Sequence, residues 1–328
     1  MVDLKIVPHP GELRRRVPIA FYVFVYLLFA LPFIILLPRH EFIPFGTVSF
    51  AIAIAFFVIL LFRWDRNHPI GSGEIYPDFG LPNYITLFRG ICLAMCAGAL
   101  TLASEPMRWF GAGFYTTAII ADYFDGFAAR RLRRTSELGT ILDVEFDSAG
   151  VLIASLSVVV YRIAGPWFVL VGLARYLFIF GMFLRRKNGH KNAKLEGSLS
   201  GRVAAGMQMG FMATAWWPVI PTRYLTVASF VFSGFFFASF IRDWLVVSRV
   251  IVKESQFYGT AEKVVRRFLP LVQVFCRIAP SVLLMWHLAD LPPISRVFAC
   301  LSAGFLIIGA LGRVAAMALI ILLMVAGS

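Results

Sequence analysis

Long apolar runs recur along this chain and restrict its fold more than any other feature of the sequence. Several reach about 18 residues or more, the length that a helix needs to cross a hydrocarbon core of roughly 30 Å. Hydrophobic residues make up 59% of the 328 residues and charged residues 15%, and the mean hydropathy is +0.80. A soluble core of this size cannot hide so much apolar surface. The sequence therefore predicts an all-α, polytopic integral membrane protein.

The positions of the apolar runs predict the spans. They lie near 17–37, 45–62, 84–103, 107–129, 143–162, 166–184, 199–217, 224–247 and 268–287. A last stretch, 295–327, is long for one helix and short for two, and Gly309, Gly312 and Arg313 would kink or break it. We therefore expect about ten spans in all.

The net charge of +13 follows the expected membrane topology. Basic residues form short clusters between the apolar runs and not one continuous face, which argues against a nucleic-acid-binding protein. Alternate loops differ sharply in Lys and Arg content, and cytoplasmic loops carry the excess. The N-terminus and the basic loop 130–142 are therefore predicted to be cytoplasmic, which in a bacterium means the cytoplasmic face of the inner membrane. The four cysteines lie in apolar runs without zinc-ligand spacing, so packing is their expected role: Cys92, Cys96, Cys276 and Cys300.

A polar segment at 63–82, rich in Gly, Pro and Asp, separates the first two spans from the rest. It suggests three parts: a leader, two spans and linker at 1–82, a core at 83–247, and further spans at 248–328. The stretch from Pro8 to Pro18 either lies along the lipid headgroups or forms a solvated leader.

Four aspartates gather in the middle of the chain. The segment reads Asp122-Tyr-Phe-Asp125-Gly126-Phe-Ala-Ala129-Arg130, then eight residues, then Gly139-Thr-Ile-Leu-Asp143-Val-Glu-Phe-Asp147. Residues three or four apart share a helix face, so Asp122 pairs with Asp125, and Asp143 with Asp147. The two helices are consecutive and antiparallel, so both pairs can converge on one point at their cytoplasmic ends.

Such a cluster of carboxylates needs positive charge to offset repulsion and desolvation. Hard oxygen ligands favour Mg²⁺ or Mn²⁺, and two such ions about 4 Å apart can clamp the attacking and leaving oxygens of a phosphoryl displacement. The residues therefore point to metal-assisted phosphoryl transfer.

The glycines near the aspartates have two possible roles, and the neighbouring arginines have one expected role. Gly126 and Gly139 lie one turn from an aspartate on the acidic faces, where they either admit a ligand to the backbone or allow close helix packing. Arg131, Arg133 and Arg134 are expected to be membrane anchors of the cytoplasmic face.

The segment 122–147 resembles the CDP-alcohol phosphatidyltransferase family, whose signature is D-x2-D-G-x2-A-R-x8-G-x3-D-x3-D. Every fixed position matches. The resemblance implies a six-helix core, here about 84–247, and leaves both ends of the chain outside it. It also implies transfer of a substituted phosphate from a CDP-linked donor to an alcohol with release of CMP, in a protein that is often a homodimer.

The resemblance assigns roles to individual residues. Asp122 and Asp143 would bridge two divalent cations, Asp125 would bind one, and Asp147 would bind the other and act as general base. The implied donor-binding residues are Asn83, Thr86, Gly126, Ala129, Arg130, Ser136 and Gly139. Asn83 could instead be a helix N-cap, and Thr86 an ordinary helix residue.

Arginines at membrane depth are candidates for the acceptor site. Arg175, Arg202 and Arg242 could grip an acceptor phosphate. Alternatively, Arg242 pairs with the adjacent Asp243, and Arg202 reaches to the interface.

The expected donor is CDP-diacylglycerol, with a small alcohol or phospho-alcohol as acceptor. A CDP-choline or CDP-ethanolamine donor with diacylglycerol as acceptor is the alternative within the enzyme class. A cation or proton transporter is disfavoured because the acids cluster at one face and do not thread the bilayer. A catalytically silent membrane scaffold is the remaining reading.

Overall fold

The computed structural model describes residues 10–71, 75–190, 199–218 and 222–250. The predicted spans at 268–287 and 295–327, almost all of the predicted part 248–328, and Cys276 and Cys300 lie outside the described residues.

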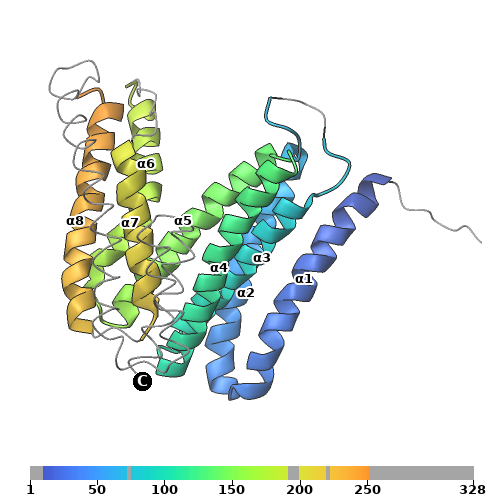
Figure 1. Cartoon of the computed structure of the whole chain (residues 1–328), viewed down its shortest axis with the longest axis horizontal. Helices are drawn as coiled ribbons and strands as arrows, with labels where there is room; N and C mark the ends of the chain where they lie inside the picture. Colours follow the sequence, from blue (N-terminus) through green and yellow to red (C-terminus); the bar gives the residue numbers. More distant parts are fainter. Residues whose placement is uncertain (1–9, 72–74, 191–198, 219–221, 251–328) are drawn as a thin grey trace, which may run out of the picture. The chain divides into compact units, whose positions relative to one another are not determined.

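Within these residues the chain is helical, with no strand beyond an isolated bridge, which confirms the all-α prediction (Figure 1). The α-helices are α1 (Pro10–Leu36), α2 (Arg39–Phe62), α3 (Leu81–Leu100), α4 (Glu105–Arg131), α5 (Glu137–Val160), α6 (Val169–Lys187), α7 (Leu199–Trp216) and α8 (Thr222–Val247). Two short 3₁₀ helices are η1 (Trp64–Arg66) and η2 (Pro166–Phe168). Each predicted span up to residue 247 has a helical counterpart.

Five of the described helices are long and apolar enough to cross a membrane. They are Arg16–Leu36, Arg39–Phe62, Leu81–Leu100, Pro166–Lys187 and Thr222–Val247. An integral membrane protein accounts for these helices and for the many large apolar side chains on their exposed faces.

The stretch from Pro8 to Pro18, predicted either to lie along the lipid headgroups or to form a solvated leader, belongs to α1 from Pro10 onward. This helix begins at Pro10 and continues through Pro18 and Pro32. Pro10 is tolerated at the start of the helix, because the N–H that a proline lacks has no intrahelical partner in the first turn. Pro38 then separates α1 from α2, since proline disfavours a helical conformation in the residue before it.

The chain divides into two compact units. The first comprises Met1–Leu177, Gln208–Pro218 and Thr222–Ser233, and the second Phe178–Met207, Val219–Pro221 and Gly234–Ser328. In the second unit the ring of Phe178 packs edge-on against Trp244 at 5.5 Å, and Gly181 leaves room for the same indole. The first unit contains all four aspartates.

The core of the first unit is α3, which packs against α1, α2, α4 and α5. Every residue from Ile91 to Leu100 is buried, including the two free cysteines Cys92 and Cys96. Small residues let neighbours approach: a Cβ atom on Gly90 would lie 2.7 Å from the Phe146 ring of α5. The buried helix therefore fixes α4 and α5 on either side of it.

An arginine of α4 caps the C-terminal end of α7 in the same unit. Arg108 donates from Nε to the carbonyl of Trp216 at 3.1 Å and from Nη2 to that of Ala215 at 2.9 Å. Its guanidinium lies 5.0 Å from the ring centre of Tyr161. A cation at a helix C-terminus satisfies carbonyls that have no partner within the helix.

Replacing Arg108 with alanine is expected to lower the stability of the protein by about 1–3 kcal/mol, because these carbonyls lose their donor. Thermal unfolding of the detergent-purified protein measures this. The control is Arg223→Ala, which removes an exposed arginine that contacts only its neighbour Tyr224 among the described residues. Equal unfolding temperatures for the two variants would contradict the capping role.

Candidate active site

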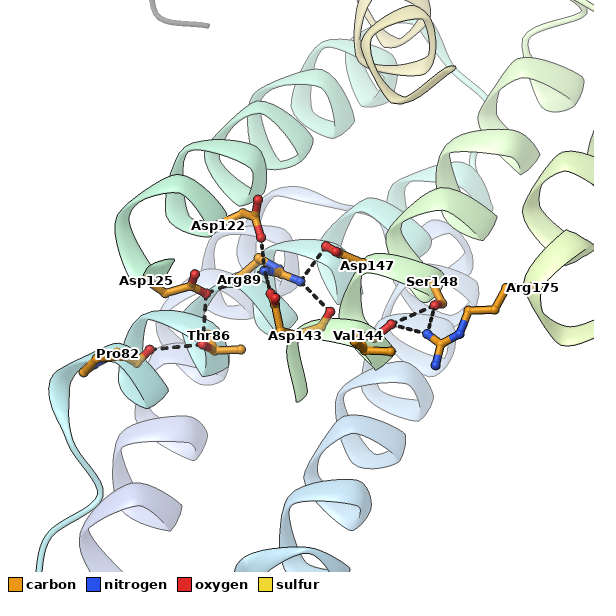
Figure 2. A network of polar contacts seen from close by, with 10 residues as sticks. All are labelled: Pro82, Thr86, Arg89, Asp122, Asp125, Asp143, Val144, Asp147, Ser148 and Arg175. Carbon is orange, nitrogen blue, oxygen red and sulfur yellow. Dashed lines mark hydrogen bonds and ion pairs between the residues drawn. The ribbon is translucent and has the colours of Figure 1, made fainter. Parts of the chain in front are cut away.

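The four aspartates come together because α4 and α5 both pack against α3. The connection is short: α4 ends at Arg131, Arg133 adopts the left-handed φ of 53°, and α5 begins at Glu137. Ser136 is the N-cap of α5, and its Oγ accepts a hydrogen bond from Gly139 N at 2.9 Å. Figure 2 shows the side chains of both helices turned toward one point.

That point is occupied by Arg89 of α3, whose side chain is only 3% exposed. Its Nη1 contacts Asp122 Oδ1 and lies 2.8 Å from Asp143 Oδ1, and its Nη2 lies 2.8 Å from Asp147 Oδ1 (Figure 2). Asp125 Oδ2 is 3.6 Å from Nη1. A single guanidinium therefore reaches all four carboxylates, and it supplies charge compensation that a buried acidic cluster requires.

The carboxylates are suited to a divalent cation. One oxygen each from Asp122, Asp143 and Asp147 lies within 4.8 Å of the others. These three side chains are 38–46% exposed, so an ion can reach them. Asp125 is more buried, and its Oδ2 lies 2.9 Å from Thr86 Oγ1. Carboxylate oxygens are the hard ligands that Mg²⁺ and Mn²⁺ prefer, and the position of Arg89 shows that the cluster accommodates positive charge.

A polar cavity of about 250 Å³ adjoins the cluster between α3, α4 and α5. All seven residues predicted to bind the donor line it: Asn83, Thr86, Gly126, Ala129, Arg130, Ser136 and Gly139. Asp125, Asp143 and Arg134 line it as well. A larger cavity, about 670 Å³ between α1, α3 and α4, has an apolar lining without acids or bases, so we assign no chemistry to it.

The structure bears on several of the readings left open by the sequence. Asn83 is not the N-cap of α3, because Gly80 holds that position. A Cβ atom on Gly139 would lie 3.0 Å from Asn83 Oδ1 and 3.1 Å from Ser136 Oγ, so the missing side chain allows close packing at the cavity wall. Thr86 Oγ1 lies 3.1 Å from Pro82 O, a contact that an ordinary helix threonine makes, and 2.9 Å from Asp125 Oδ2.

The three acceptor candidates differ in their surroundings. Arg175 of α6 contacts Val144 O and Ser148 Oγ (Figure 2). Its Nη2 lies 3.1 Å from Glu145 Oε1. Arg242 lies in the second unit and pairs with Asp243 Oδ1 at 2.5 Å, as the alternative reading expected. Arg202 belongs to α7, but its side chain is outside the described part of the structure.

The sequence reasoning missed Arg89 of the site and Asn67, a neighbour of the cavity wall. Asn83, Thr86 and Arg89 are spaced three apart, and this stripe on one face of α3 was a usable signal for the arginine. Asn67, which contacts Asn83, lies in the polar linker, where no periodicity marks it.

Comparisons with known proteins agree with the geometry. The sequence profile of the CDP-alcohol phosphatidyltransferase family matches residues 79–237. Three relatives are named CDP-diacylglycerol--glycerol-3-phosphate 3-phosphatidyltransferase, and each is 30% identical over the aligned residues. The protein from Cereibacter sphaeroides aligns over 36% of this chain and 55% of its own length. Those from Shigella flexneri and Escherichia coli align over 47% of this chain and 86% of their own lengths.

No solved structure matches this chain. The profile match spans the helices that carry the aspartates, and two of the relatives are covered over most of their length. The chain therefore belongs to the CDP-alcohol phosphatidyltransferase family and is a transferase enzyme of that family.

Proposed function

We propose that this protein transfers the phosphatidyl group of CDP-diacylglycerol to an alcohol and releases CMP, with glycerol 3-phosphate as the first acceptor to test. The observation that carries the proposal is the convergence of four aspartates on Arg89 beside a cavity lined by all seven predicted donor-binding residues. The donor and acceptor come from the names of the relatives, of which this chain spans 55% to 86%.

Asp122, Asp125, Asp143 and Asp147 would hold the divalent cations in this proposal, with Asp122 and Asp143 as ligands to both ions, Asp125 to one and Asp147 to the other. Bound Mg²⁺ or Mn²⁺ would neutralise the charge of the donor diphosphate and of the departing CMP. Arg89 contributes a further positive charge that is already fixed at the centre of the cluster.

Asp147 is the general base in this proposal. In the part of the chain that the structure describes, its hydrogen bond from Arg89 uses Oδ1, so we assign Oδ2 to the acceptor proton. The acceptor oxygen attacks the phosphorus that bears diacylglycerol, and the bond from that phosphorus to the bridging oxygen breaks. The bridging oxygen leaves with CMP, and the proton passes to Asp147. Fixed positions of donor and acceptor supply much of the rate.

The donor occupies the cavity of about 250 Å³ in this scheme. Gly126 and Gly139 allow the donor to approach the backbone, and Arg130 provides a cation for its phosphates. Asn83, Thr86 and Ser136 supply polar groups on the α3 and α5 walls.

For the acceptor, Arg175 is the candidate with the best structural support. It contacts Ser148, the residue that follows Asp147 on α5, and its side chain is 33% exposed. We propose that it binds the phosphate of a phospho-alcohol acceptor. Arg202 and Arg242 remain further proposed residues of the acceptor site.

The finer architecture belongs to the same proposal. We propose about ten spans in all. The six-helix core covers 83–247, between an N-terminal part at 1–82 and a C-terminal part at 248–328. The active site lies on the cytoplasmic face, and the protein forms homodimers. The basic loop between α4 and α5 supports the orientation because cytoplasmic loops are enriched in Lys and Arg.

A matrix of substrates tests the proposal. The purified protein is incubated with Mg²⁺ or Mn²⁺ and either CDP-diacylglycerol plus one of several alcohols or CDP-choline plus diacylglycerol, and the lipid products are identified by mass spectrometry. We expect phosphatidylglycerol phosphate from CDP-diacylglycerol and glycerol 3-phosphate. A choline phospholipid as the sole product would instead establish the alternative donor, and no product from any pair would overturn the enzymatic proposal.

A further inference from the structure

The linker between α2 and α3 packs against two walls of the donor cavity. We call its described residues, 63–71 and 75–80, the strap. Its two ends are held together by the stacked rings of Trp64 and Phe79, whose centres are 5.4 Å apart. Asn67 links them further, since its Nδ2 donates to Asp78 O at 3.1 Å and its carbonyl accepts from Tyr76 N at 2.8 Å. The strap is therefore an ordered loop with its own hydrogen bonds.

Asn67 also fixes the orientation of Asn83 on the α3 wall. It is 2% exposed, and its Oδ1 accepts a hydrogen bond from Asn83 Nδ2 at 3.1 Å. The same amide nitrogen donates to Phe79 O at 2.6 Å. Because both amide hydrogens point at the strap, Asn83 Oδ1 faces the other way, where Ser136 Oγ lies 3.4 Å from it.

The strap holds the α5 wall as well. Pro69 forms a backbone bridge with Ser136, and Glu137 N donates to His68 O at 3.0 Å. The side chain of Glu137 is flanked by Arg66 at 2.7 Å and by His68 at 3.3 Å. The N-terminus of α5, which closes the cavity, is thus fastened to the strap.

The contact between the strap and the cavity wall is close. The space that remains between Asn67, Asn83 and Ser136 is about 10 Å³, roughly the room for one water molecule. The strap enters α3 at Gly80, whose φ of 81° suits a glycine. A displacement of Asn67 would therefore also displace Asn83 and Ser136.

We propose that the strap is part of the donor-binding site and that Asn67 is a positioning residue for the CDP moiety, acting through Asn83 and Ser136. Most of the strap precedes the region matched by the family profile, which begins at residue 79. The inference rests on the proposed function, because it assumes that the cavity holds the CDP-linked donor.

The test is steady-state kinetics of the full-length protein with Asn67→Ala. We expect the KM for CDP-diacylglycerol to rise about tenfold, while kcat and the KM for the acceptor stay within about twofold, because only the orientation of the donor wall is lost. Asn67→Asp keeps an oxygen facing Asn83 Nδ2 but loses the donor to Asp78 O, so we expect it to raise the donor KM, by less than Asn67→Ala does. The matched control is Asn188→Ala, which makes the same change at an exposed asparagine outside the strap and outside the cavity lining.

The outcomes separate the inference from the proposed function. Absence of CMP release by the wild-type protein would overturn the proposed function. An active wild type with an unchanged donor KM in Asn67→Ala, or with only kcat or the acceptor KM altered, overturns the role of the strap. If the alanine variant does not fold, binding of CMP to Asn67→Asp and to Asn188→Ala is compared by thermal shift. Weaker CMP binding by Asn67→Asp alone then supports the inference, and equal binding by the two overturns it.

Discussion

Replacing Asp147 with asparagine is expected to reduce CMP release by at least about a thousandfold, because the variant loses both a proton acceptor and a metal ligand. The change keeps the shape of the side chain, and Arg89 Nη2 still has an oxygen to contact. Expression and the unfolding temperature should therefore stay close to those of the wild type. Radiometric or coupled measurement of CMP gives the rate.

The matched control is Glu105→Gln, which removes an exposed carboxylate at the opposite end of α4 from the cluster. We expect wild-type activity for this variant. Activity of Asp147→Asn within about tenfold of the control would remove Asp147 from the role of base, since general bases contribute about a hundredfold or more.

Replacing Arg89 with methionine is expected to make the protein depend on divalent cations for its stability. The variant leaves four carboxylates around a site that has lost its buried cation, and removal of one partner from such a group costs about 3–5 kcal/mol in a fully buried case. Three of the carboxylates are 38–46% exposed, so solvent reduces the cost, and we expect about 2–3 kcal/mol in EDTA. Added Mg²⁺ or Mn²⁺ should restore much of it, because an ion that binds only the folded state stabilises it.

Thermal unfolding in EDTA and in a titration of Mn²⁺ measures this effect independently of activity. Arg223→Met serves as the control because it removes an exposed arginine of α8. Equal unfolding temperatures of Arg89→Met and Arg223→Met in EDTA would show that Arg89 is not the counter-charge of the cluster.

The α4–α5 pair shows how far a sequence can predict a site. Spacings of three and four residues place Asp122 with Asp125 and Asp143 with Asp147, and a short loop makes the two helices antiparallel. The structure brings both pairs to Arg89, and the cavity beside them is lined by the residues that the family resemblance indicated. Local spacing was sufficient for the aspartates because all four lie on two consecutive helices.

Contacts between segments far apart in sequence could not be predicted in this way. Arg89 reaches Asp147 across 58 residues, and Asn67 reaches Asn83 from a linker without helical periodicity. The same limit applies to Arg175, whose partners on α5 depend on how α5 and α6 pack. Pairwise packing of helices, and not the composition of any one helix, decides these contacts.

The most direct measurement is CMP release by the purified protein from CDP-diacylglycerol and glycerol 3-phosphate, first in EDTA and then with Mg²⁺ or Mn²⁺ added. Asp122→Asn is assayed in parallel. We expect no release in EDTA, release on addition of either ion by the wild type, and none by Asp122→Asn at any ion concentration. Equal release in EDTA, or a fully active Asp122→Asn variant, would contradict a divalent-cation site built from these aspartates.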